Sequence, residues 1–299
     1  MTPQLEENVR FVTLVRSPHE RWCARMLIDS IRSFGGVFNR CPVWLFDMDG
    51  QDQSGQPFMD PDVKVLSLRV PENVRHFFFA DKVFACSRAE AMAVSAVQSL
   101  IWIDPACLVI NPPLLYELGS TFDAAVRPVH IQNVGLLPDE PLDGFWRGIF
   151  EVVGVEDIQT SVETFVDEQR IRSYFNSHAF AMKPSRGLLR RWFECFETLV
   201  GDEDYQMEAC QDERHQIFLH QAIWSALLVA EVDSQQIREL PPDYNYPYNL
   251  HPSVPLRKRA KALNDLVTVA YERRSLNPGL MDDIDVHEPL RSWLSTHTA

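Results

Sequence analysis

Residues 100–113 read Leu-Ile-Trp-Ile-Asp-Pro-Ala-Cys-Leu-Val-Ile-Asn-Pro-Pro, and this stretch decides the fold class of the chain. Two short apolar runs, 100–103 and 107–110, flank the single carboxylate of Asp104. Apolar runs of this length, rich in Ile and Val, are typical of strands that are buried on both faces in the centre of an α/β sheet. The stretch therefore predicts an α/β fold with a mostly parallel central sheet flanked by helices.

Asp104 is the one charged residue of this stretch. Because an unpaired charge is costly inside a sheet, we expect Asp104 where the strand emerges, with Pro105 ending the ladder. Ligands of open α/β sheets bind at the carboxyl ends of the strands. Asp104 is therefore a candidate ligand-binding residue, and the alternative is that it only caps a turn.

The segments at the start of the chain alternate between strands and a helix. Residues 11–15 and 43–46 are apolar runs typical of strands. Between them, apolar side chains recur at helical spacing from Trp22 to Phe34, and Gly35-Gly36 follows as a stop signal. Strand, helix and strand make a βαβ unit, which implies parallel pairing with a right-handed crossover.

The rest of the first half continues this alternation. Residues 47–61 are polar and contain several Gly and Pro, which predicts a loop. We predict a third strand at 63–68, a helix from about residue 81 to about residue 98 and a further strand at 122–127. No glycine-rich fingerprint accompanies these elements, which disfavours a dinucleotide cofactor site of the Rossmann type.

The second half has weaker strand signals. Its predicted helices and strands are 144–153, 179–182, 188–200, 215–229 and 266–270. The acidic segment 201–212 is expected to be exposed, and the aromatic, amide-rich segment 239–251 is expected to be a loop. Residues 276–299 are expected to form a C-terminal tail.

Composition narrows the classes of function. The 299 residues carry a formal charge of −14, which argues against a sequence-independent grip on nucleic acid or on an anionic membrane. Six cysteines without a Cys-x-x-Cys pair indicate reduced, buried thiols. The first residues resemble no signal peptide, and no apolar run is long enough to span a membrane. We therefore expect a cytoplasmic protein.

Four groups of residues share a pattern with one enzyme family. They are Phe11-Val-Thr-Leu-Val with Ser30-Ile-Arg-Ser-Phe, Ile101-Trp-Ile-Asp-Pro-Ala, Tyr174-Phe-Asn-Ser, and the series His220-Gln, Leu240-Pro and Tyr244-Asn. In this order they resemble motifs of the GT-A class of nucleotide-sugar glycosyltransferases, especially its family-8-like, glycogenin-like branch. The second group resembles the acidic Asp-x-Asp motif of that family.

The resemblance implies one GT-A domain with a nucleotide-binding half (1–128) and an acceptor and sugar half (129–275). It implies transfer of a sugar, with retention, from a nucleotide-diphosphate sugar of the UDP type to an acceptor. The implied nucleotide-binding residues are Leu14, Val15, Arg16, Lys82, Asp104 and Ala106. The implied substrate-binding residues are Asn176, Ser177, His178, Gln221, Tyr244 and Asn245, with Gln221 and His220 as catalytic candidates.

The same resemblance implies Mn²⁺ or Mg²⁺ as a cofactor that neutralises the diphosphate. Asp104 is one candidate ligand, but Ala106 stands where the family usually has a second acid, and a methyl group cannot replace an oxygen ligand. His178 replaces the usual Gly and His220 the usual Asp. The family's C-terminal metal and phosphate signature is absent, and His251 is the other candidate ligand.

Each implied role has a simpler alternative. Lys82 reaches a phosphate or is a solvated lysine at a helix start. Arg16 pairs with a diphosphate or with a neighbouring acid. His178 and His220 act as acid or base groups or complete a polar network. The tyrosines from Tyr244 onward stack on a sugar or cover a core edge.

Three functions follow, in order. The first is a glycosyltransferase in which Arg16, Lys82 or a nearby arginine offsets the diphosphate charge if no metal binds. The second is a catalytically inactive GT-A-like relative that serves as a binding or assembly module, which Ala106 favours. A nucleotidyltransferase ranks last because the segment after the first strand lacks a glycine-rich, basic loop.

Overall fold

The computed structural model describes residues 2–48 and 58–298. Most of the predicted loop 47–61 lies outside the described residues. The helices are α1 (Thr2–Asn8), α2 (Pro18–Phe34), α3 (Ala80–Met92), α4 (Gly144–Val153), α5 (Leu188–Gly201), α6 (Glu203–Ala209), α7 (Glu213–Glu231) and α8 (Leu290–His297). None of the described helices is long and apolar enough to cross a membrane.

The central sheet has seven strands in the order β10-β6-β9-β4-β1-β2-β3. Its strands are β1 (Val9–Val15), β2 (Val43–Asp47), β3 (Val63–Ser67), β4 (Ser99–Ile103), β6 (Ala124–Val126), β9 (Ala179–Met182) and β10 (Ile237–Glu239). All neighbouring pairs are parallel except that β9 runs antiparallel between β4 and β6. The predicted α/β class with a mostly parallel sheet is confirmed.

Side chains that alternate along the strands build a core on each face of the sheet. Val12, Leu14 and Trp102 pack in one core with residues of α3, α5 and α7. Phe11 and Ile101 pack in the other core with the apolar stripe of α2. Helices therefore cover both faces, which leaves the strand ends as the accessible edge of the sheet.

Two smaller sheets complete the chain. β11 (Tyr246–Pro247), β12 (Thr268–Ala270) and β5 (Cys107–Val109) form one, so the second apolar run of the opening stretch leaves the central sheet. β7 (Ser161–Glu163) and β8 (Arg170–Arg172) form the other, in a region where the sequence has only weak strand signals. The predicted strand 266–270 is confirmed as the shorter β12.

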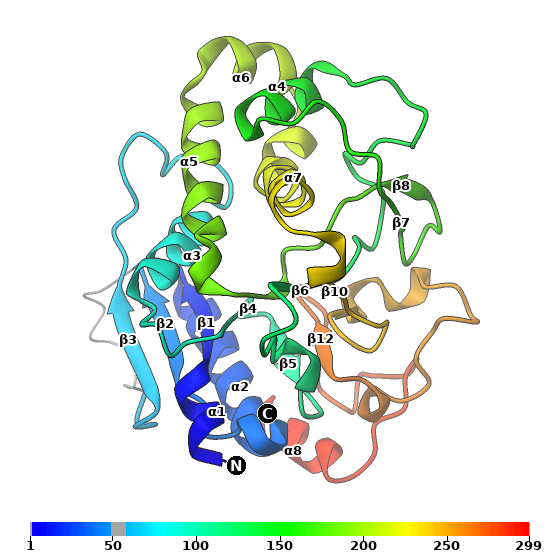
Figure 1. Ribbon diagram of the computed structural model, residues 1–299. Helices are drawn as coiled ribbons and strands as arrows, with labels where there is room; N and C mark the ends of the chain where they lie inside the picture. The colour runs from blue at the N-terminus through cyan, green and yellow to red at the C-terminus, as the bar shows by residue number, and fades with distance from the viewer. Residues whose placement is uncertain (1, 49–57, 299) are drawn as a thin grey trace.

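Several predicted boundaries are wrong. The helix expected to reach residue 98 ends at Met92, because Ala93 takes an extended conformation and the chain turns before β4. The acidic segment 201–212 is largely exposed, as expected, but holds the short helix α6. The expected tail is also ordered: α8 lies against α2, where Trp293 Nε1 donates to Ser33 Oγ at 3.0 Å (Figure 1).

All six cysteines are buried and free of disulfides, as their apolar surroundings predict.

Candidate functional site

The strand order places a topological switch point between β1 and β4. The chain runs outward from β1 to β2 and β3 on one side, then returns to β4 on the other side of β1. Arg16 directly follows β1, and Asp104 directly follows β4. In open α/β sheets a ligand crevice forms at the carboxyl ends of strands at such a point. The predicted place of Asp104 at a strand end is confirmed.

Both carboxylate oxygens of Asp104 have partners. Oδ1 accepts Trp102 Nε1 at 2.8 Å, and Oδ2 accepts the Lys82 ammonium at 2.9 Å. The Asp104 amide donates to the carbonyl of His178 at 2.8 Å. Asp104 is therefore held by three residues and does more than cap a turn.

Lys82 is buried, with 1% of its side chain exposed, so it is not a solvated lysine at a helix start. Its ammonium also donates to Ser177 Oγ at 3.3 Å. The rings of Phe79 and Trp102 lie 5.6 and 5.5 Å from Nζ. A lysine charge in such dry surroundings depends on a close counter-ion, which here is Asp104.

Ser177 extends this network to α7. Its Oγ lies 3.0 Å from His220 Nε2, and its amide donates to Gln221 Oε1 at 3.1 Å. Because His220 Nδ1 faces the carbonyl of Ile217 at 2.8 Å, Nδ1 carries the proton and Nε2 accepts from the serine. Burial, reinforced by Lys82, lowers the pKa of His220 well below the usual value, so the ring is neutral.

A second network joins His178 to two asparagines. Asn176 Oδ1 accepts the His178 amide at 2.7 Å and Asn245 Nδ2 at 2.9 Å. The same oxygen lies 2.9 Å from His178 Nδ1. His178 Nε2 lies 3.3 Å from Glu272 Oε1, and this hydrogen bond lowers the pKa of Glu272. The network brings three chain segments to one place.

Arg16 is engaged by acids on two helices. Its Nε donates to Asp81 Oδ2 at 2.5 Å, and its Nη1 lies 2.9 Å from Glu20 Oε1. These carboxylates raise the pKa of Arg16 further above its usual value despite the opposing effect of burial. The side chains of Leu14 and Val15 are buried in the core, so only their backbone faces the strand end.

Residues at strained backbone angles gather around these networks. Phe79, Asn245 and Glu272 have φ angles of 60°, 47° and 48°, in the left-handed region that non-glycine residues rarely adopt. Phe79 precedes α3 and stacks on His220 at 4.3 Å between ring centroids. Such strain concentrates at functional sites, which supports a binding role for this edge.

The donor groups do not fit a divalent metal. Ala106 offers no side-chain oxygen, and its carbonyl accepts the amides of Tyr271 and Glu272. His251 lies elsewhere, with Nδ1 2.7 Å from Tyr246 Oη and Nε2 3.1 Å from the Asp283 carbonyl. In the part of the chain that the structure describes, no three His, Cys, Asp or Glu side chains are arranged to hold a metal ion.

The tyrosines of the segment 239–251 belong to the core. Tyr244 is 3% exposed, packs edge-on against Tyr116 and accepts the amide of Leu115 through its hydroxyl. Tyr246 and Tyr248 are also buried. This segment therefore covers a core edge, and its ring faces are not open for stacking on a sugar.

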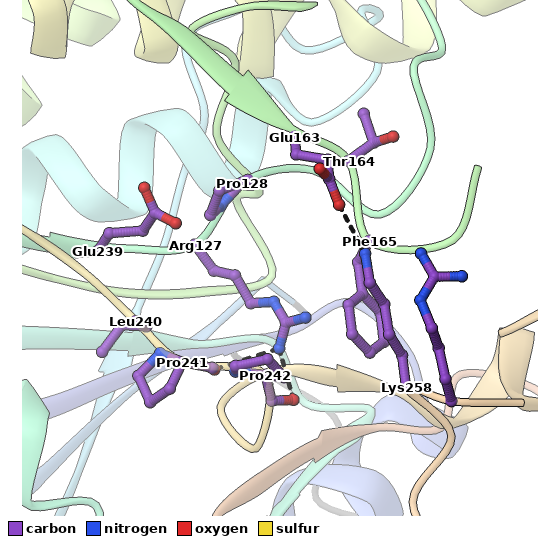
Figure 2. A pocket seen from close by; sticks show the side chains of 11 residues that line it. Arg127, Pro128, Glu163, Thr164, Phe165, Glu239, Leu240, Pro241, Pro242 and Lys258 are labelled. Atoms are coloured by element: carbon purple, nitrogen blue, oxygen red, sulfur yellow. Dashed lines mark hydrogen bonds and ion pairs between the residues drawn. The ribbon is translucent and has the colours of Figure 1, made fainter. Parts of the chain in front are cut away.

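A cavity of about 690 Å³ opens along the same edge of the sheet, beyond β6 and β10. Figure 2 shows Arg127 pointing into it between Glu239 and Phe165. The Arg127 guanidinium is fixed by the carbonyls of Pro242 and Tyr244, each at 2.6 Å, and lies over the ring of Phe165. The volume of the cavity is in the range of small-molecule sites.

The cavity adjoins the His178 network. The Arg127 carbonyl accepts the amide of Asn176 at 2.8 Å. Lys258 and Glu163, which line the cavity, form an ion pair at 2.7 Å. Sequence reasoning missed Arg127, Glu272 and the cavity, because their partners come from distant segments. Trp102 lay in the opening stretch, but nothing in the sequence shows its bond to Asp104.

A scan against models of protein families found no match to this chain, and a search of curated proteins found no similar sequence.

Proposed function

We propose that this chain has a GT-A fold, binds a nucleotide-diphosphate sugar of the UDP type and transfers the sugar to an acceptor. The observation that carries the proposal is the meeting of Asp104, Arg16 and the amides of Asn176, Gln221 and Asn245 at the switch-point edge. Carboxylates and amides that converge at such an edge suit ribose and sugar hydroxyls, which both donate and accept hydrogen bonds.

In the proposed reaction the bond between the anomeric carbon and the diphosphate oxygen breaks, and its electron pair leaves with the nucleoside diphosphate. The acceptor hydroxyl oxygen forms the new bond to the anomeric carbon, and its proton passes to the departing diphosphate oxygen. We assign the nucleotide to Asp104 and the donor sugar to the asparagine network. The acceptor is assigned to the cavity lined by Arg127 and Phe165, because it adjoins Asn176.

Calorimetric titration with UDP, GDP and UDP-sugars tests the donor site. We expect UDP to bind, and Asp104→Ala to weaken its binding at least tenfold. The matched control is Asp139→Ala, an exposed acid outside the site, which is expected to bind UDP as the wild type does. Circular dichroism checks that each variant is folded. Failure of the folded wild type to bind any nucleotide would overturn the donor-site assignment.

A second candidate is a catalytically inactive relative that binds nucleotide sugars or assembles with a partner. Ala106 and the bonds that hold both oxygens of Asp104 within the protein favour it. Release of UDP from UDP-sugars, with and without candidate acceptors, separates the two. Binding without release under any of these conditions would support the inactive module, whereas acceptor-dependent release would support the transferase.

A further inference from the structure

The position of a metal at Asp104 is already taken by a side-chain cation. The Lys82 ammonium lies 2.9 Å from Asp104 Oδ2, while Trp102 Nε1 occupies Oδ1. A metal ligated by this carboxylate would lie beside the Lys82 ammonium and be repelled by its like charge. Because only 1% of the Lys82 side chain is exposed, the ammonium and the metal would share one counter-ion in dry surroundings, which is strongly unfavourable.

A second side-chain contact lies near Ala106. The amides of Tyr271 and Glu272 bind the Ala106 carbonyl, and the Glu272 carboxylate turns to His178 Nε2 at 3.3 Å. His178 stands at one of the positions where this chain departs from the pattern that it resembles. Through Glu272, this departure lies close to another, Ala106.

Lys82 retains capacity to bind an anion. An ammonium has three N–H donors, and the bonds to Asp104 and Ser177 use two. Within residues 2–48 and 58–298, no further acceptor lies on Nζ. A cation held between the rings of Phe79 and Trp102 is poorly solvated, so its attraction for a nearby phosphate is stronger than in water.

We propose that the Lys82 ammonium takes the place of the divalent cation, so that this chain binds the diphosphate of its nucleotide without a metal ion. This inference rests on the proposed function for its ligand. It replaces the expectation of Mn²⁺ or Mg²⁺, which the donor groups of the described residues do not fit.

Two calorimetric titrations of the wild type test the inference. UDP is titrated in EDTA and, separately, in MnCl₂, and the two Kd values are expected to agree within twofold. Binding at least tenfold tighter with Mn²⁺ would overturn the inference. Mn²⁺ alone is then titrated without nucleotide, and no saturable binding is expected. Mn²⁺ binding that Asp104→Asn abolishes would also overturn it.

The two proposals fail in different ways. Absence of UDP binding in both buffers would refute the nucleotide site and the role of Lys82 together. UDP binding that requires Mn²⁺ would support the nucleotide site and refute only the metal-free inference. Metal-independent UDP binding that survives the loss of Lys82 would support the nucleotide site and refute the role of Lys82 as the cation.

Variants of Lys82 supply the last comparison. Lys82→Met is expected to weaken UDP binding in EDTA at least tenfold. The control Lys261→Met, at an exposed lysine outside the site, is expected to leave UDP binding unchanged.

Because Lys82→Met leaves Asp104 without its counter-ion, the double variant Lys82→Met/Asp104→Asn removes both charges. It is expected to fold at least as stably as the single variant and to bind UDP no better. UDP binding at wild-type strength by a folded double variant would overturn the inference.

Discussion

His130 shows what burial does to one ionisable side chain. It is 7% exposed, and neither ring nitrogen has a hydrogen-bond partner among the described residues. Burial lowers its pKa well below the usual value, and the charges of Arg127 and His178 act in the same direction. The folded state therefore holds the ring neutral, whereas the unfolded chain protonates it near its ordinary pKa.

This difference predicts acid sensitivity. The unfolded state binds a proton at His130 and the folded state does not. The free energy of unfolding that depends on His130 is therefore present above about pH 6.5 and falls as the pH drops below that value. Between pH 7.5 and pH 5.5 the loss of unfolding free energy from this histidine is on the order of 1 kcal/mol. We expect His130→Leu to reduce the pH dependence of the unfolding free energy by about this amount.

Urea unfolding of both proteins at the two pH values measures the difference. Parallel pH profiles for the wild type and His130→Leu would contradict this account of His130.

The helix α7 brings His220, Gln221 and Ser225 to the strand ends, and its first turn is capped by Asp212. Asp212 Oδ1 accepts the amide of His215 at 3.0 Å, and Oδ2 lies 2.6 Å from the Nδ1 of the same ring. These bonds lower the pKa of Asp212, so its carboxylate stays ionised and matches the positive end of the helix.

Loss of this cap is expected to cost about 1 kcal/mol. Asp212→Ala should lower the midpoint of urea unfolding accordingly, and Asp212→Asn should retain most of the stability because asparagine also caps helices. Equal destabilisation by both substitutions would show that the charge of Asp212, and not its capping hydrogen bond, stabilises the helix. Neither variant should alter nucleotide binding, since Asp212 is exposed and outside the site.

The last helix, α8, packs into a core that includes residues from distant parts of the chain. Leu294 of α8 is fully buried in a core that also contains Met26 of α2 and Val269 of β12. The segment expected to be a tail therefore joins elements from both ends of the chain. A buried leucine in such a position contributes to the stability of the entire fold.

Leu294→Ala is expected to destabilise the protein by about 3 kcal/mol, through lost burial and the cavity left behind. Unfolding followed by tryptophan fluorescence and by circular dichroism should remain a single, coincident transition. The exposed Leu280 provides the matched control, and Leu280→Ala should change stability by less than about 0.5 kcal/mol. A separate early transition in Leu294→Ala would show that α8 is an independent appendage.

Much of the fold was predictable because strands and helices are local patterns. The apolar runs around residues 11–15, 43–46 and 100–103 and the helical stripe before Gly35 depend only on neighbouring residues, and the structure confirms them. Predicted helix ends were less accurate, as at Met92, because a helix also ends where tertiary packing turns the chain. The ordered C-terminal helix was missed because it gains its stability from α2.

The site was predictable only in part. The sequence placed Asp104 at a strand end, and the structure brings Lys82, Ser177, His220 and Gln221 to it. Tyr244 and His251, in contrast, are buried and engaged in packing and hydrogen bonds within the protein.

The sequence alone therefore determined the fold class, the order of most strands and helices, and the edge at which Asp104 emerges, because these follow from local periodicity and the cost of burying charge. Tertiary structure alone decided that β9 enters antiparallel, that Lys82 neutralises Asp104 and that His178 faces Glu272. Each of these pairs joins segments far apart in the chain, and no local pattern specifies which distant partner will satisfy a buried charge.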